Sequence, residues 1–297
     1  MDLISIRRKY RNIRNIIIAI FILIMAIIFI LMIKEINKKS KYQKVYTAYE
    51  NQIKQLQTTD NGEMENRNKQ EDNKGKLPQL TDEGKNNFAN IYHSDTKRVF
   101  LTFDDGPSET VTPVVLDTLK NENIKATFFL LGSRVELNPE LVKREYKEGH
   151  YLASHGYSHV YSQIYASPQS VIDEYNRSVT AIRNAIGEQE YNPHLFRFPG
   201  GYWGGKYAEV KKQAAQILDQ NNILHIDWNS LTSDAAGAKT TEQFIAELEK
   251  SVPKHNSVVV LMHDAGNKEA TANALPTIIK YFRDRGFEFE NFYSIIK

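Results

Sequence analysis

The sequence predicts an α/β fold: a distorted, incomplete (β/α) barrel of about seven units, preceded by one transmembrane helix and a flexible linker. Two observations favour the barrel. From about residue 88 onward, short apolar runs alternate with segments of helical periodicity, which is typical of a parallel sheet covered by helices. Polar residues follow the ends of several of these runs, where ligands bind in such folds. An open, doubly wound sheet is the alternative architecture.

The composition limits the classes of function. A chain of 297 residues, 41% of them hydrophobic, is long enough to bury a large core. The formal net charge of +2 gives no electrostatic reason to expect nucleic acid as a partner. The chain has no cysteine, which excludes disulfides and thiol catalysis.

The N-terminal region predicts a membrane anchor. Residues 1–15 are basic, and residues 16–33 are 18 consecutive uncharged, strongly apolar positions. At about 1.5 Å per residue they span about 27 Å, enough for a bilayer core. A secretory signal peptide is the alternative, but the run is long for one and no small-residue cleavage site follows it. Basic residues flank both ends, so charge alone does not orient the segment.

Residues 34–87 are expected to separate the anchor from the globular part. Apolar positions between residues 42 and 57 follow a three-four spacing, which indicates a short amphipathic stalk helix. From residue 58 to about residue 87 the chain is mostly Asn, Asp, Glu, Lys, Gln and Gly. Such a segment buries too little apolar surface to order itself, so we expect a flexible linker there and a folded domain over residues 88–297.

Strands and helices alternate along this domain. The expected strands, each read from an apolar run, are 99–103, 126–131, 151–153, 195–198, 224–228, 258–262 and 287–293. The expected helices between them are 112–121, 139–148, 168–186, 206–221, 241–251 and 270–285. In this arrangement the polar residues that follow the strands gather at one end of the sheet.

Two adjacent aspartates follow the first strand, in the segment TFDDGP. Like charges side by side repel unless a cation or a proton neutralises one of them, so Asp104 and Asp105 favour a divalent-metal site. Neighbouring residues of a strand point to opposite sides, which makes it hard for both carboxylates to share one ion. A turn at Gly106 and Pro107 would still bring both to the rim, and Asp104 then suits a general base for a metal-activated water.

Two histidines four residues apart follow the third strand, in the segment SHGYSH. His155, His159 and Asp105 would leave open positions on an ion, as a catalytic site requires. Zinc is the default ion for this set, with cobalt, manganese, nickel or iron as alternatives. The spacing lacks the glutamate of the HExxH proteases. Iron oxygenases also use a His-His-carboxylate set and remain an alternative class.

Two further side chains complete the candidate site. Arg197 lies among apolar residues at the end of the fourth strand, where an unpaired guanidinium is unfavourable, and a bidentate pair would hold Asp104 ionised. His263 follows the sixth strand and suits a proton donor to a leaving amine, although a structural core histidine is the alternative. The aromatic residues near these segments suit a sugar groove and a core equally well: Tyr157, Tyr161, Tyr165, Tyr202, Trp203 and Trp228.

Four segments, in their order and spacing, resemble the NodB-type polysaccharide deacetylases of carbohydrate esterase family four: TFDDGP, HGYSH, RFPGG and LMH. The resemblance covers residues 97–297. It implies a distorted (β/α) barrel that removes acetyl groups from N- or O-acetylated sugars with the help of one divalent metal ion. It further implies that Asp104 is the base, that Arg197 orients it, and that the metal ligands are Asp105, His155 and His159.

The resemblance also implies the substrate site. The backbone N–H of Gly200 would help to hold the oxyanion, Leu261 would line the pocket of the acetyl methyl group, and His263 would protonate the departing amine. Further substrate-site residues implied are Pro199, Trp228 and Asp234.

The chain departs from the family pattern at four places. Gly156 stands where Ser or Thr is usual, and Gly200 replaces a common aromatic residue. In the fourth motif, the places of an aspartate that supports the catalytic histidine and of a groove tryptophan correspond to Leu231 and Ala235. Asp234 is the candidate to compensate for the missing aspartate.

An enzyme held near a membrane by a long tether suits a polymer fixed at the cell surface. We therefore expect metal-dependent hydrolysis of the linear amide C–N bond of N-acetylated cell-wall polysaccharide, first of all the N-acetylglucosamine of peptidoglycan, with release of acetate. The chain would be a single-pass protein of the cell membrane with its catalytic domain, residues 88–297, on the extracytoplasmic side. Alternatives are an exported N-acetylglucosamine polymer, chitin or xylan as substrate, a non-catalytic glycan-binding protein, or a cyclic-amide hydrolase.

Overall fold

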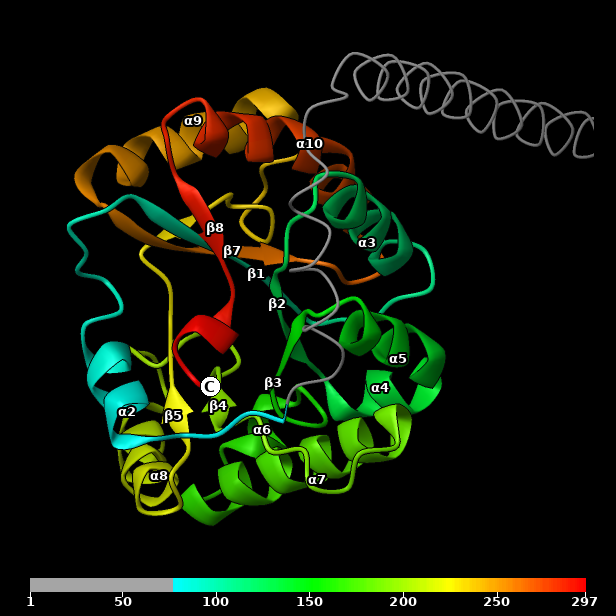
Figure 1. Cartoon of the computed structure of the whole chain (residues 1–297). Coiled ribbons are helices and arrows are strands. Elements are labelled where there is room, and N and C mark those ends of the chain that lie inside the picture. Colours follow the sequence, from blue (N-terminus) through cyan, green and yellow to red (C-terminus); the bar gives the residue numbers. More distant parts are fainter. Residues whose placement is uncertain (1–76) are drawn as a thin grey trace, which may run out of the picture. The chain divides into compact units, whose positions relative to one another are not determined.

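A curled sheet of parallel strands lies at the centre of residues 77–297, the part of the chain that this computed structural model describes, and helices surround it (Figure 1). The strand order is β5-β4-β3-β2-β1-β7-β6, and β8 also pairs with β1. Every pairing is parallel. The near-sequential order is that of a half-barrel, consistent with the expected incomplete (β/α) barrel, whereas a doubly wound sheet reverses its order at a switch point.

The strands follow the predicted apolar runs. They are β1 (Arg98–Asp104), β2 (Thr127–Leu130), β3 (Tyr151–Ser154), β4 (Leu195–Phe196), β5 (Leu224–His225), β6 (Ser230–Leu231), β7 (Ser257–His263) and β8 (Glu288–Glu290). The predicted runs 195–198 and 224–228 are longer than β4 and β5, because their last residues leave the sheet to enter loops. β6 is not among the predicted strands, since two residues are too few to show a pattern.

The six predicted helices are present, with ends within two residues of those expected: α3 (Thr112–Asn121), α5 (Pro139–Lys147), α7 (Pro168–Ile186), α8 (Ala208–Gln220), α9 (Thr241–Ser251) and α10 (Glu269–Arg283). Five short elements were not predicted: α2 (Asp82–Ala89), α4 (Gly132–Leu137), α6 (Tyr161–Ile164) and the 3₁₀ helices η3 (Val252–Lys254) and η4 (Phe292–Ser294). All five are too short for a clear hydrophobic period.

Residues 77–87, which were expected to belong to the flexible linker, include most of α2. The side chain of Thr81 caps α2 by accepting a backbone hydrogen bond. The N–H of Gln79 donates to the carbonyl of Lys297, and Phe88 packs against a core cluster that includes Phe292. The partners of this segment come from the far end of the chain, so its local composition could not reveal that it is ordered.

The predicted anchor, residues 16–33, lies outside the described residues. So do the N-terminal basic segment, the predicted stalk and the linker up to residue 76. Within residues 77–297, none of the helices combines the length and the hydropathy that crossing a membrane would require.

Alternation along the strands separates an outer layer of side chains from an inner one. Outward residues of β1 and β7 share a core cluster with the helices, while Phe100 and Val259 belong to a second cluster inside the curled sheet. Because side chains alternate with a period of two, Asp104 and His263 follow the inner row. The register pairs the Cα atoms of these two residues. The outward residues are Val99, Leu101, Phe103, Val258, Val260 and Met262.

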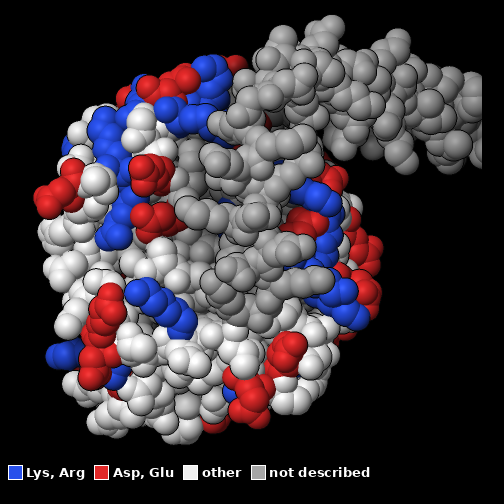
Figure 2. Space-filling model, in the orientation of Figure 1, with Lys and Arg blue, Asp and Glu red and all other residues white. Residues whose placement is uncertain are grey.

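Charged side chains are mixed in sign over the surface. Figure 2 shows Lys and Arg beside Asp and Glu along the margin of one face. Ion pairs also link helices and loops, such as Arg283 with Glu122 at 2.6 Å and Arg285 with Glu249 at 2.5 Å. Solvent and salt screen such exposed pairs, so the buried apolar clusters account for most of the stability.

Candidate metal and catalytic centre

Asp105, His155 and His159 come together beyond the carboxyl ends of β1 and β3. Oδ1 of Asp105 lies 3.5 Å from Nε2 of His155 and 3.4 Å from Nε2 of His159. One ligand atom from each of the three residues lies within 4.8 Å of the others. The fold therefore brings to one place the three side chains that the sequence analysis put forward as metal ligands.

Two residues of this group adopt left-handed backbone conformations. Asp105 has φ 72° and His159 has φ 57°. Such conformations are unfavourable for residues other than glycine and tend to occur at functional sites. The turn at Asp105 ends the alternation of β1, so both adjacent carboxylates approach His155, whose Nε2 lies 3.7 Å from Oδ2 of Asp104.

Three observations fit a divalent cation in this place. Oδ1 of Asp105 is buried and has no hydrogen-bond partner among the described residues. Nδ1 of His155 donates to the carbonyl of Arg197 at 2.8 Å, so the lone pair of Nε2 faces the carboxylate. Burial lowers the pKa of His155 to about 3, which keeps the ring neutral and able to bind a cation. Two imidazoles and a carboxylate suit zinc and several other transition-metal ions.

Asp104 and Arg197 form a buried ion pair. Nη1 of Arg197 donates to Oδ1 of Asp104 at 2.8 Å and to the hydroxyl of Thr102 at 2.7 Å. The expected bidentate pair is wrong, because the other donors of the guanidinium are used elsewhere. Nε donates to the carbonyl of Ile226 at 3.2 Å and Nη2 to the carbonyl of Asp227 at 3.0 Å. Arg197 thus fixes the position of Asp104 and also ties β1 to the segment after β5.

The surroundings make Asp104 more basic than an exposed aspartate. Burial raises the pKa of Asp104 above its ordinary value, because a low-dielectric environment disfavours the carboxylate. The positive charge of Arg197 and then that of His263 oppose this rise. A general base benefits from such a raised pKa, since its affinity for a proton then lies nearer to the working pH.

His263 lies beside Asp104 on the neighbouring strand β7, and Asp234 holds its side chain. Nδ1 of His263 donates to Oδ1 of Asp234 at 2.8 Å, and its backbone N–H donates to Oδ2 at 2.9 Å. Burial alone would lower the pKa of His263, but the hydrogen bond and charge of Asp234 outweigh it and hold the pKa above its ordinary value. Asp234 therefore supports His263 in the way that position 231, occupied by Leu231, cannot.

The loop after β4 carries Pro199 and Gly200 and is held by side chains of neighbouring segments. The hydroxyl of Tyr165 donates to the carbonyl of Pro199 at 2.7 Å, and Nζ of Lys211 donates to the carbonyl of Gly201 at 2.6 Å. Gly200 has φ 75°, a region in which glycine carries no steric penalty. Within residues 77–297 the N–H of Gly200 has no acceptor. The N–H of Gly200 is therefore a donor that a ligand could use.

Two other residues expected at the substrate site, Leu261 and Trp228, lie near different members of the candidate centre. Leu261 is 7% exposed and lies two residues before His263 on β7, so the two side chains follow the same side of the strand. Trp228 is half-buried, and its ring lies 5.8 Å from the guanidinium of Arg197. Leu261 thus lies on the same side of β7 as His263, and its role as a pocket wall stays a prediction, whereas Trp228 covers the buried arginine.

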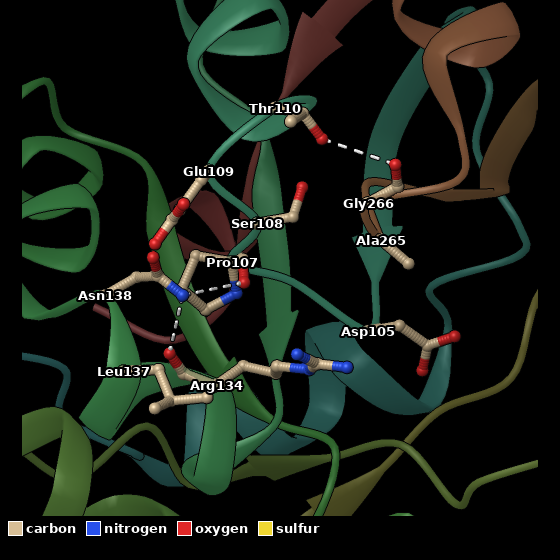
Figure 3. Close-up of a pocket in the computed structure, with 10 residues that line it drawn as sticks. All are labelled: Asp105, Pro107, Ser108, Glu109, Thr110, Arg134, Leu137, Asn138, Ala265 and Gly266. Atoms are coloured by element: carbon tan, nitrogen blue, oxygen red, sulfur yellow. Dashed lines mark hydrogen bonds between the residues drawn. The ribbon is translucent and has the colours of Figure 1, made fainter. Parts of the chain in front are cut away.

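A groove runs beside Asp105. One part of it is a hollow of about 320 Å³. Figure 3 shows the residues that line this hollow, with the long side chain of Arg134 extending in the direction of Asp105. A second hollow of about 630 Å³ shares both residues and reaches His159 and Lys268. The sequence analysis does not single out Arg134 or Lys268, because neither belongs to a motif. The first hollow is lined by Asp105, Pro107, Ser108, Glu109, Thr110, Arg134, Leu137, Asn138, Ala265 and Gly266.

The chain is similar in sequence and in fold to known proteins. The sequence model of the family described as polysaccharide deacetylase matches residues 92–217. A peptidoglycan-N-acetylglucosamine deacetylase of Listeria monocytogenes is 38% identical over 193 residues, covering 65% of this chain but only 37% of that protein. A peptidoglycan-N-acetylglucosamine deacetylase of Bacillus cereus is 34% identical over 206 residues, covering 67% of this chain and 71% of that protein. The solved structure of a Streptococcus mutans CE4 esterase, 32% identical, superposes with a TM-score of 0.63 and covers 72% of this chain and 92% of that one.

Proposed function

This chain belongs to the polysaccharide deacetylase family, and on that premise we propose that it removes acetyl groups from N-acetylated cell-wall polysaccharide by metal-dependent hydrolysis. One observation carries the proposal: a candidate base, a candidate metal set and a candidate acid lie together beyond the carboxyl ends of β1, β3 and β7. Asp104 approaches His155 at 3.7 Å on one side and pairs in register with His263 on the other. The reaction is hydrolysis of the amide of N-acetylglucosamine with release of acetate.

The metal ligands in this proposal are Asp105, His155 and His159. A divalent ion held by them, with zinc as the first candidate, would lower the pKa of a bound water and polarise the acetyl carbonyl. The unpartnered, buried Oδ1 of Asp105 and the neutral ring of His155 support this assignment.

Asp104 takes the proton of the attacking water in this mechanism. Its raised pKa favours proton uptake, while the single hydrogen bond from Arg197 keeps Oδ1 in place and leaves Oδ2 toward the centre. The N–H of Gly200 donates to the acetyl carbonyl oxygen as negative charge develops on it. Because loop contacts already fix this N–H, it needs no rearrangement during the reaction.

His263 supplies the proton for the departing amine. Asp234 holds the ring by Nδ1, so Nε2 is the nitrogen that carries the transferable proton. The raised pKa of His263 keeps a larger fraction of the ring protonated near neutral pH. When the C–N bond breaks, its electron pair goes to the nitrogen, which receives this proton and leaves as the free amine.

The substrate that we propose is the N-acetylglucosamine of peptidoglycan. Its support is the similarity to the Listeria and Bacillus enzymes, whose names state this activity, and the open groove beside Asp105. Chains of sugars bind in extended grooves, and the basic side chains of Arg134 and Lys268 suit the acidic groups of a cell-wall polymer. We further propose that residues 16–33 anchor the chain in the cell membrane, with the catalytic domain on the extracytoplasmic side.

The experiment that tests the proposed function compares the amounts of acetate that the full-length chain releases from different substrates. The chain is kept in detergent, and zinc is added to the buffer. Purified peptidoglycan, N-acetylglucosamine oligomers and acetylated xylan are incubated separately, and mass spectrometry measures free acetate and new amines. We expect acetate and amine in equal amounts from peptidoglycan. Acetate from xylan alone would assign the other substrate class, and a zinc-loaded chain that releases none from any substrate would contradict the proposal. The Asp104→Asn variant separates an enzyme from a glycan-binding protein, because only an enzyme loses a measurable reaction.

A further inference from the structure

The hydroxyl of Tyr161 lies against the backbone of Gly200. A Cβ atom added to Gly200 would stand 2.5 Å from Oη of Tyr161 and 3.1 Å from its Cζ. A carbon atom does not approach an oxygen that closely, so the hydroxyl takes the space that any side chain at position 200 would need. Glycine at this position therefore allows the hydroxyl of Tyr161 to pack against the backbone of the residue whose N–H the proposed mechanism uses.

Neighbouring rings fix the direction of Tyr161. Its ring centroid lies 5.5 Å from that of His159, 5.7 Å from that of Tyr165 and 6.5 Å from that of Tyr207. Tyr165 is itself tied to the loop, because its hydroxyl donates to the carbonyl of Pro199 at 2.7 Å. The phenol of Tyr161 is thus held between a candidate metal ligand and the loop that carries Gly200.

The Tyr161 hydroxyl is available to a ligand. The residue is 40% exposed, and within residues 77–297 its hydroxyl makes no hydrogen bond. The N–H of Gly200 also has no acceptor in this part of the chain. Two donors without acceptors in this part of the chain therefore belong to residues that contact each other, and the ring of one of them, Tyr161, lies 5.5 Å from that of His159. A phenol is protonated at neutral pH, so it can donate to an oxygen that gains negative charge.

We propose that the hydroxyl of Tyr161 donates a hydrogen bond to the carbonyl oxygen of the acetyl group, beside the N–H of Gly200. This inference rests on the proposed function. As water adds to the carbonyl carbon, the π electrons of the carbonyl move to its oxygen, and both donors stabilise that charge. When the C–N bond breaks, the carbonyl re-forms and the electron pair leaves with the protonated amine. Tyr161 keeps its proton throughout.

The test compares the Tyr161→Phe variant with the wild-type full chain on N-acetylglucosamine oligomers in zinc. Phenylalanine keeps the ring contacts with His159 and Tyr165 and removes only the hydroxyl. We expect kcat to fall about 100-fold, as for the loss of one oxyanion donor. KM should stay within about twofold, because the bond strengthens only as charge develops. Tyr157→Phe is the matched control: its hydroxyl lies in the same segment but donates to Glu136 at 2.8 Å, so kcat should not change.

Cobalt affinity and thermal stability distinguish a hydrogen bond to the substrate from a purely structural role of Tyr161. Cobalt titration followed by visible absorption should give the same affinity in Tyr161→Phe and in the wild type, and the midpoint of thermal unfolding should be unchanged. A variant with the wild-type kcat overturns the inference, and so does one that raises only KM or one that weakens cobalt binding. In each of these cases the wild type still releases acetate, so the proposed function stands. A wild type that binds cobalt but releases no acetate from these oligomers, from peptidoglycan or from acetylated xylan overturns both.

Discussion

Asp234 accepts hydrogen bonds from both Nδ1 and the backbone N–H of His263, at 2.8 Å and 2.9 Å. The hydroxyl of Thr271 donates to the same carboxylate at 2.9 Å, and Nζ of Lys268 donates to the carbonyl of Asp234 at 3.0 Å. The ring is therefore held by a carboxylate that is itself held on several sides. Such a support fixes the tautomer of a histidine and increases its basicity.

Replacement of Asp234 by Asn should move the alkaline limb of the pH–rate profile to lower pH. Asp234 raises the pKa of His263, and the reaction needs the protonated ring, so activity is lost as the pH rises through that pKa. Asparagine removes the negative charge and with it the main cause of the raised pKa. The measurement is kcat against pH for both proteins on the same oligomer. A limb that stays at the same pH would show that His263 is not the acid.

Replacement of Arg197 by Lys should destabilise the domain and abolish activity. A lysine ammonium cannot reach Asp104, Thr102 and the carbonyls of Ile226 and Asp227 together, as the guanidinium does. Breaking a buried ion pair costs about 3–5 kcal/mol, and we expect a loss of that order in the free energy of unfolding. Urea denaturation followed by circular dichroism measures it.

The matched control for that variant is Arg283→Lys, which changes an exposed arginine paired with Glu122. Its free energy of unfolding should change by less than about 1 kcal/mol, because exposed pairs contribute little. Equal losses in the two variants would contradict the importance given to the buried pair.

Replacement of Gly200 by Ala should lower thermal stability less in a Tyr161→Phe background than in the wild type. The added Cβ would strike the hydroxyl of Tyr161, which lies 2.5 Å from its position, whereas the remaining ring carbon lies 3.1 Å away. The positive φ of residue 200 adds about 1–2 kcal/mol of strain in both backgrounds and cancels in the comparison. Differential scanning calorimetry of the four proteins gives the coupling. Additive losses would mean that the two groups do not meet.

Local sequence patterns were enough to predict the long helices and the polar residues that follow buried strands. Asp104 and His263 each end an apolar strand, and a polar residue that follows a buried strand of a parallel sheet must lie at the ligand-binding edge. The same reasoning placed Asp105, His155 and Arg197 at that edge. Long helices such as α7 were predicted because nineteen residues show a full hydrophobic period.

The features that were missed depend on contacts between distant segments. Helix α2 is ordered by the C-terminal residues against which it packs. The guanidinium of Arg197 makes one bond to Asp104 instead of two because two backbone carbonyls, 29 and 30 residues away, occupy its other donors. The contact between Tyr161 and Gly200 joins the first residue of α6 to the loop after β4, and no local pattern encodes the approach of these two segments.

The central claim is that side chains from separate strands act around one divalent ion. The most direct test is to strip the full-length chain of metal with a chelator, dialyse it, and titrate zinc while acetate release from N-acetylglucosamine oligomers is measured. We predict no acetate from the metal-free chain, a return of activity that is complete at one equivalent of zinc, and no return in a His159→Ala variant. Acetate release that is independent of zinc, or unchanged by the loss of His159, would contradict the account.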